Sequence, residues 1–149
     1  MISIIFLCWA VLSTLFTTYY LYRYEALQSQ LSRYSNKTYI YVTLGINYGN
    51  DSKTVWFNNT RMETGSTLLD LTCNVSNVNY TSYGSMGCFV NSINGVENEN
   101  PMFWMWWYWN DYSGWIEGPV AADKYVISDG EILMWFYENT SISPLPTPP

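Results

Sequence analysis

The sequence has 149 residues, which suits one domain with short additions, and only 12% of them are charged, about half the share of a typical soluble domain. The net charge is −6 with no basic run, so nucleic acid is not expected as a partner. Histidine is absent, which removes the commonest general base and the commonest zinc ligand.

The first predicted element is an apolar helix. Residues 2–22 form a run of 21 residues without a charge, a length that matches the roughly 30 Å hydrocarbon core of a bilayer. A cleaved signal peptide is the competing interpretation, but the segment has neither a basic start nor a small-residue cleavage site. We expect a transmembrane anchor over residues 1–23, with the lipid membrane as the partner of residues 2–22. A helix that packs against copies of itself, as in a filament, is a third interpretation.

The helix is expected to continue beyond the anchor as a stalk over residues 24–37. No proline or glycine interrupts residues 2–35, and four apolar or aromatic residues follow a heptad spacing. Two heptads leave two interpretations open: the stripe packs on the chain's own domain, or it forms a seam with another helix. The stripe consists of Tyr24, Leu27, Leu31 and Tyr34.

Six Asn-x-Ser/Thr sequons indicate on which side of the membrane the rest of the chain lies. Arg23 and Arg33 follow the anchor, and by the positive-inside rule they favour a cytoplasmic C-terminus. Sequons at this density instead mark exposed positions on a secreted chain. We therefore expect a single-pass protein of the cell membrane whose C-terminal domain is extracellular and glycosylated. The predicted glycosylation sites are Asn36, Asn50, Asn58, Asn74, Asn79 and Asn139.

A β-rich ectodomain is predicted over residues 38–138. Residues 40–48 alternate between apolar and polar, which predicts a strand, and residues 54–58 return as the second strand of a hairpin. A short helix follows and ends near Val75, with Thr64 or Ser66 as its N-cap.

Three further strands are predicted after a polar loop that extends to Gly87. They lie near residues 89–93, at residues 102–109 and at residues 131–137, and Asn94-Gly95 marks a tight turn after the first of them.

This order of elements predicts an α+β fold. One helix packs on a β-grasp-like mixed sheet, with the first and last strands as neighbours at its centre. Residues 139–149 contain four prolines and are predicted to form a flexible, Pro-rich tail.

Two of the three cysteines fall in the predicted ectodomain. Because disulfides persist in oxidising compartments, we expect a bridge between Cys73 and Cys88 that closes a loop of about 15 residues. Two unpaired buried thiols are the alternative. Cys8 lies in the anchor, where a cysteine acts as an ordinary small apolar residue.

Four segments follow each other in an order that resembles a known family. They are GSTLLDL at 65–71, FVNSINGV at 89–96, FWMWWYWN at 103–110 and GPVAADKYVISDGEILMWFYE at 118–138. The set resembles the small β-grasp domain at the C-terminus of transcobalamin and intrinsic factor, which also occurs in bacterial and archaeal surface proteins of unknown function. The anchor and the charge-poor ectodomain are similar to the archaeal cell-surface members. The positions that match the family pattern are Ser92, Ile93, Asn94, Gly95, Trp104, Trp106, Asn110, Lys124, Tyr125, Asp129 and Gly130.

The resemblance implies a fold more strongly than it implies a ligand. In the cobalamin carriers this domain closes over a corrin together with a separate helical domain. We identify no such helical domain in this sequence. The resemblance therefore gives little support for cobalamin binding, and no cofactor is expected.

No catalytic or metal-binding pattern emerges from the polar residues. Ser, Thr and Tyr have no histidine to activate them, and neither a phosphate loop nor a calcium-loop spacing occurs. The carboxylates of the last third indicate a solvated acidic rim, with a glycosidase-like pair as the alternative. We expect no enzyme and no metal site. These carboxylates are Asp111, Glu117, Asp123, Asp129, Glu131 and Glu138.

Residues 103–109 hold six aromatic side chains and Met105, so both faces of the predicted strand carry large side chains. Either nearby loops cover the second face, or part of it is open as a binding surface. The sequence therefore predicts an extracellular interaction domain that presents aromatic rings to a glycan, a flat small molecule or a protein of the membrane or cell envelope. The alternative is a structural or accessory subunit of a larger membrane or surface assembly, a filament included. The predicted ligand- or partner-binding residues are Trp104, Trp106, Tyr108 and Trp115.

Overall fold

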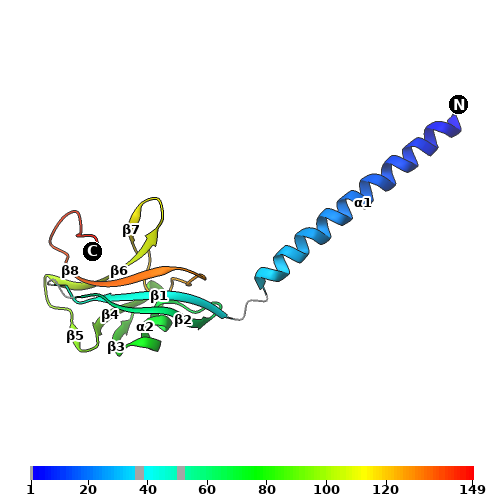
Figure 1. The fold of residues 1–149 in the computed structure, drawn as a ribbon. Helices are drawn as coiled ribbons and strands as arrows, with labels where there is room; N and C mark the ends of the chain where they lie inside the picture. The colour runs from blue at the N-terminus through cyan, green and yellow to red at the C-terminus, as the bar shows by residue number, and fades with distance from the viewer. Residues whose placement is uncertain (1, 36–38, 50–52) are drawn as a thin grey trace. The chain divides into compact units, whose positions relative to one another are not determined.

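The structure, a computed structural model, describes residues 2–35, 39–49 and 53–149. The chain divides into two compact units, residues 1–38 and residues 39–149. The first unit contains one long helix, and the second contains every strand of the described chain (Figure 1).

The first unit is α1 (Ile2–Ser35), which is uninterrupted as predicted for residues 2–35. Hydroxyl groups within it are satisfied by the helix itself: the Thr14 side chain donates to the carbonyl of Val11 at 2.8 Å. Large apolar side chains such as Trp9 and Phe16 are exposed on this unit. Across the described residues, no helix is both long and apolar enough to cross a membrane.

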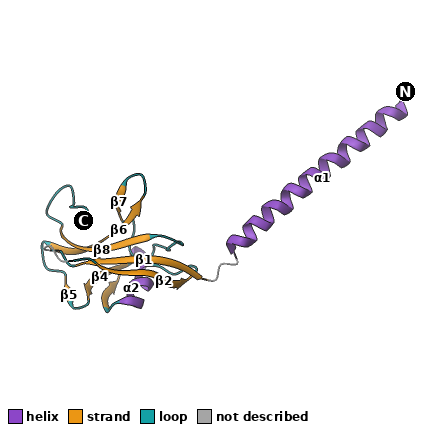
Figure 2. Cartoon of the chain, viewed as in Figure 1, coloured by secondary structure: helices purple, strands orange, loops and turns teal. Residues whose placement is uncertain are grey.

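Five strands form the main sheet of the second unit, in the order β2-β1-β8-β6-β7 (Figure 2). Neighbouring strands are antiparallel except β1 and β8, which run parallel and pair Ile46 with Trp135. The predicted pairing of the first and last strands at the centre of the sheet is therefore confirmed. The strands are β1 (Tyr39–Asn47), β2 (Val55–Glu63), β6 (Met102–Asn110), β7 (Gly114–Glu117) and β8 (Ile132–Asn139).

A second layer covers one side of the main sheet (Figure 1). It contains a helix and a small three-stranded sheet in the order β3-β4-β5, so the fold is a mixed α+β architecture with two sheets. The single sheet predicted from the sequence is corrected here, because β3 lies in a segment that was predicted to be a loop. Its side chains are exposed or half-buried, and no apolar alternation marks it. The elements of this layer are α2 (Leu68–Val75), β3 (Val78–Ser82), the 3-10 helix η1 (Gly84–Met86), β4 (Cys88–Ile93) and β5 (Val96–Glu97).

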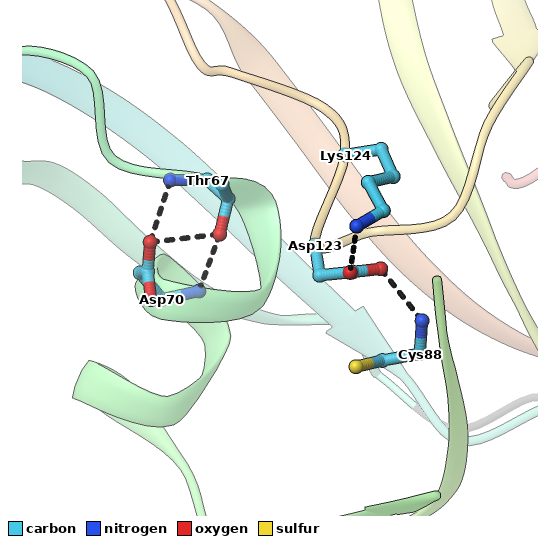
Figure 3. A network of polar contacts seen from close by, with 5 residues as sticks. All are labelled: Thr67, Asp70, Cys88, Asp123 and Lys124. Atoms are coloured by element: carbon cyan, nitrogen blue, oxygen red, sulfur yellow. Dashed lines mark hydrogen bonds and ion pairs between the residues drawn. The ribbon is translucent and has the colours of Figure 1, made fainter. Parts of the chain in front are cut away.

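Helix α2 ends at Val75 as predicted, but its N-cap is Thr67 and not Thr64 or Ser66. The Thr67 hydroxyl accepts the backbone N–H of Asp70 at 3.2 Å, and the Asp70 carboxylate accepts the backbone N–H of Thr67 at 2.8 Å (Figure 3). This capping box satisfies two backbone donors that the first turn would otherwise leave open. The three hydroxyl residues look alike in the sequence, and the backbone conformation decides which one caps the helix.

The core lies between the main sheet and the second layer. Burial alternates along β1 from Tyr39 to Leu44, as predicted, and the strand is buried on both faces from Leu44 to Asn47. Its apolar side chains share a core with those of α2 and β4. Asn94 and Gly95 both have positive φ, 51° and 84°, so the predicted tight turn is confirmed and joins β4 to β5.

The C-terminal segment, predicted as a flexible tail over residues 139–149, returns to the side of the main sheet away from α2 (Figure 1). β8 includes Asn139, the first residue of this segment, and Pro148 near its end is buried. Residues 141–144 are exposed, so the segment contacts the domain near its two ends, and the predicted flexibility of its middle stays a prediction.

The predicted disulfide is corrected by the structure, in which Cys73 and Cys88 are free thiols. Cys73 lies on α2 and is exposed as a whole residue, but partial burial of its thiol, and to a smaller extent the charge of Asp70, raise the pKa of that thiol. Cys88 begins β4, and its backbone N–H is held by Asp123. The two cysteines therefore lie on different elements of the second layer, Cys73 on α2 and Cys88 at the start of β4.

The sequon asparagines of the second unit differ in exposure. Asn58, Asn74 and Asn79 are exposed. Asn139 is half-buried, and its side-chain oxygen accepts the backbone N–H of Ser141 at 2.9 Å. Asn36 and Asn50 lie outside the described residues, as do the end of the predicted stalk at residues 36–37 and residue 38, the first of the predicted ectodomain.

Candidate functional site

Strand β6 separates two environments because it carries large side chains on both faces. Trp104 and Trp106 point toward the second layer and are 3% and 6% exposed. We call this side of the main sheet the inward face. Trp107 and Trp109 point the other way, to the outward face, where Trp107 is buried and Trp109 is exposed.

A cleft of about 510 Å³ opens on the inward face. One wall comes from η1 and β4, the other from residues 118–122, and the buried rings of three tryptophans form its floor. The rim is apolar, and its most exposed member is Met86 at 78%. We call this site the aromatic cleft. Its lining consists of Tyr83, Met86, Gly87, Cys88, Phe89, Val90, Trp104, Met105, Trp106, Gly118, Val120, Ala121, Ala122 and Trp135.

The indole N–H groups of the floor are all used inside the protein. Trp104 donates to the carbonyl of Val96 and Trp106 to the carbonyl of Val120, both at 2.9 Å. Trp135 donates to the Thr72 hydroxyl of α2 at 2.8 Å, and that hydroxyl donates in turn to a backbone carbonyl. These bonds fix the orientation of the rings, so the floor presents ring surface and not hydrogen-bond donors.

Two glycines allow the walls of the cleft to approach. A Cβ at Gly118 would overlap the indole ring of Trp106, and the Gly118 N–H donates to the Trp106 carbonyl at 2.8 Å. A Cβ at Gly87 would overlap Ala121, and Gly87 has a φ of +100° that glycine tolerates. The shape of the cleft therefore depends on both positions lacking a side chain.

One carboxylate ties the two walls together beside the cleft (Figure 3). Asp123 accepts the backbone N–H of Cys88 at 2.6 Å through Oδ1, and its Oδ2 lies 3.2 Å from Lys124 Nζ. The hydrogen bond from Cys88 is the main cause that lowers the pKa of Asp123, and Lys124 lowers it further. The carboxylate stays ionised and joins the start of β4 to the segment after β7.

The outward face contains a buried carboxyl group. Glu138 is 2% exposed, and its Oε1 accepts the indole N–H of Trp107 at 3.0 Å. Its Oε2 is buried without a hydrogen-bond partner among the described residues. Burial raises the pKa of Glu138 to about 7; the hydrogen bond from Trp107 opposes this rise, and the nearby charge of Glu117 adds a smaller contribution to it. The outward face therefore holds a buried carboxyl group, whereas the lining of the aromatic cleft on the inward face contains none.

The structure does not bring the four predicted binding residues together. Trp104 and Trp106 line the aromatic cleft, and Tyr108 is half-buried on the same face, where its ring stacks with Tyr125 at 6.3 Å between centroids. Trp115 pairs with Trp109 across the β6–β7 hairpin, with ring centroids 5.4 Å apart, and so belongs to the outward face.

The rim residues were missed by sequence reasoning. Tyr83, Met86 and Val120 are isolated apolar residues outside the strands, and Phe89 is an exposed residue of β4, so no periodicity distinguishes the four as a group. The one available signal is that large apolar side chains occur in segments otherwise rich in Ser, Gly and Asn. That signal alone does not show that residues 83–89 lie opposite residues 118–122.

The predicted acidic rim does not assemble into a metal site. In the described ranges, no group of three or more His, Cys, Asp or Glu side chains is placed to hold a metal ion. Several of these carboxylates serve the fold instead: Glu131 accepts the Tyr125 hydroxyl at 2.8 Å and the backbone N–H of Ser128 at 2.9 Å.

No protein-family model matches the chain, and no curated protein sequence matches it. Solved structures do share its fold. A protein from Ruminococcus gnavus, for which metal binding has been suggested, is 16% identical with a TM-score of 0.50, over 67% of this chain and 97% of that one. Haptocorrin in complex with Cbi is 18% identical with a TM-score of 0.53, over 68% of this chain and 26% of that one. Haptocorrin belongs to the transcobalamin family, so a distant relationship in fold to that family is confirmed.

Proposed function

We propose that the chain is a membrane-anchored, N-glycosylated extracellular binding domain whose ligand enters the aromatic cleft. The cleft itself carries the proposal. Its volume of about 510 Å³ lies within the range of roughly 300–1,000 Å³ that is typical of small-molecule sites. Exposed apolar side chains around its rim are costly to leave in water, and such groups are typical of binding surfaces.

The proposal includes a β-grasp fold and membership of the transcobalamin and intrinsic-factor C-terminal group, in the manner of its archaeal surface members. The parallel pairing of β1 and β8 at the centre of the main sheet supports this fold. The likeness to haptocorrin supports the group, although it covers only 26% of that protein. The ligand of haptocorrin is not part of the proposal.

The proposed placement at the membrane is supported by the sequence of α1 and by the sequons. Residues 2–22 carry no charge, and tyrosines close the segment in the way that interfacial residues do. Asn58, Asn74 and Asn79 are exposed on the second unit, where a glycan can be attached without disturbing the core.

A structural or accessory subunit is the second candidate function. The exposed apolar side chains of α1, such as Trp9, Leu12 and Phe16, favour it because they suit contact with other helices as well as with lipid. In that case α1 and the aromatic residues are protein interfaces.

Native mass spectrometry of the full chain extracted in mild detergent tests the proposal. A bound small molecule is expected on the wild-type chain and is expected to be lost from Met86→Glu, which places a charge on the rim. The control is Val126→Glu, which makes the same change at an exposed apolar residue outside the lining. A chain that carries no small molecule and co-purifies with other proteins equally in all three forms supports the subunit function instead.

A further inference from the structure

We infer that the ligand of the aromatic cleft is a neutral, apolar molecule, built of aromatic rings or hydrocarbon chain, and not a glycan, an ion or a charged metal complex. The inference rests on the proposed binding function of the cleft and specifies its ligand class. Three features of the lining support it: its charge, its hydrogen-bonding groups and the chemistry of its rim.

The lining carries no charged side chain. The nearby carboxylate of Asp123 is already engaged by the backbone N–H of Cys88 and by Lys124. A charged ligand would therefore lose its hydration on entering the cleft without meeting an opposite charge. This feature argues against ions and against metal complexes that carry charge.

The hydrogen-bonding groups of the floor are turned into the protein. The indoles of Trp104, Trp106 and Trp135 donate to groups of the chain at 2.8–2.9 Å, so they cannot also serve a ligand. The remaining polar side-chain groups of the lining are the Tyr83 hydroxyl and the Cys88 thiol. A sugar presents many hydroxyl groups, and most of them would be buried against ring carbon without a partner.

The rim consists of side chains that adapt to an apolar surface. Met86 has a flexible thioether that adjusts to irregular shapes, and the residues Tyr83 and Phe89 are 55% and 44% exposed. A ligand that covers these side chains removes their apolar surface from water, which is the main driving force that this site can supply. The fixed floor and the adaptable rim together suit a range of neutral hydrocarbon shapes.

Photolabelling of the full chain in detergent tests the ligand class. Three probes share one aryl diazirine: the neutral aryl diazirine itself, the same group bearing a carboxylate, and the same group attached to maltotriose. After illumination, proteolysis and mass spectrometry locate the labelled residues. Apolar probe dissolved in the micelle also labels α1, and this labelling is an internal control for the amount of probe that reacts.

The neutral probe is expected to label residues 83–90 and 118–122 at least tenfold more than the other two probes do. Met86→Glu is expected to reduce this labelling by about tenfold and to leave labelling of α1 unchanged, whereas Val126→Glu leaves both unchanged. If the carboxylate or maltotriose probe labels the cleft more than the neutral probe does, the ligand class is wrong and the binding function stands. If no probe labels the cleft, the inference and the binding function both fail.

Discussion

The two faces of the main sheet share one aromatic strand and yet differ in chemistry. On the inward face, the rings of Trp104 and Trp106 are fixed by hydrogen bonds to backbone carbonyls and form the floor of an apolar cleft. On the outward face, the Trp107 indole is bound to the buried carboxyl group of Glu138. Because both faces of β6 carry tryptophan rings, the aromatic residues alone do not determine which face of the sheet binds a ligand.

The difference arises from what lies over each face. The second layer meets the inward face through apolar residues of α2 and β4 and leaves a cleft where η1 faces residues 118–122. The outward face has an ionisable group whose burial raises its pKa. The comparison therefore predicts that the floor of the aromatic cleft is sensitive to changes in side-chain shape, and that the stability contributed by Glu138 on the outward face falls as the pH rises.

The largest expected effect is the loss of a floor ring. Trp106→Ala is expected to lower the free energy of unfolding by about 3–5 kcal/mol, because it removes a buried indole that packs on Gly118 and Tyr125. Trp109→Ala, on the exposed end of the outward face, is expected to cost less than half as much. Urea unfolding of both variants measures the difference. Equal losses would mean that the two faces contribute alike to the core.

The next effect is a pH dependence of stability that arises from Glu138 on the outward face. Because burial raises the pKa of Glu138 from 4.5 to about 7, the native state binds this proton more tightly than the unfolded chain does. The associated stability is fully present below pH 4.5 and is lost as the pH rises through 7, by about 3 kcal/mol at most.

Unfolding measured from pH 4.5 to pH 8 checks this loss, with Glu138→Gln as the matched variant. The variant keeps an oxygen that can accept the Trp107 indole N–H and removes the titration, so its stability is expected to change less over this range. A wild-type chain that becomes more stable as the pH rises through 7 would contradict the assignment.

The smallest effect concerns the carboxylate beside the cleft. Asp123→Asn replaces a charge-assisted hydrogen bond to Cys88 with a neutral one and is expected to cost about 1–2 kcal/mol. Since the pKa of Asp123 is lowered in the folded state, its contribution is present above the unfolded pKa and is lost as the pH falls through the folded value.

The contribution of Asp123 to the free energy of unfolding therefore increases with pH, whereas the contribution of Glu138 decreases with pH. Thermal unfolding of Asp123→Asn at pH 6 and pH 3 checks it, and the cost of the substitution is expected to shrink at the lower pH. Asp111→Asn, at an exposed carboxylate of the β6–β7 hairpin, is the control. If the loss of stability caused by Asp123→Asn is the same at both pH values, the charge of the carboxylate does not contribute and only its shape and hydrogen bond matter.

Much of the fold could be predicted because local patterns determine it. The alternation in β1, the apolar β8, the Asn94-Gly95 turn and the unbroken α1 follow from periodicity and turn chemistry. β3 could not be found in this way, since its side chains are largely exposed and its strand character comes from pairing with β4.

The site was harder to predict because it depends on contacts between distant segments. The sequence predicts Trp115 as a binding residue together with Trp106, but the register of the β6–β7 hairpin pairs Trp115 with Trp109 and so fixes it on the other face. The cleft forms where η1 approaches Gly118, and no local pattern reports that approach. The sequence therefore predicts the aromatic rings that form the floor of the cleft, but it does not predict the residues of the walls and the rim.

The most direct test of the account is fluorine NMR of the full chain labelled with 5-fluorotryptophan, titrated with naphthalene as a neutral apolar probe. The resonances of Trp104, Trp106 and Trp135, assigned by single substitutions, are expected to shift, while those of Trp109 and Trp115 stay in place. A titration that shifts Trp109 and Trp115 and leaves the three floor residues unchanged would contradict the account, because ligand would then bind the outward face.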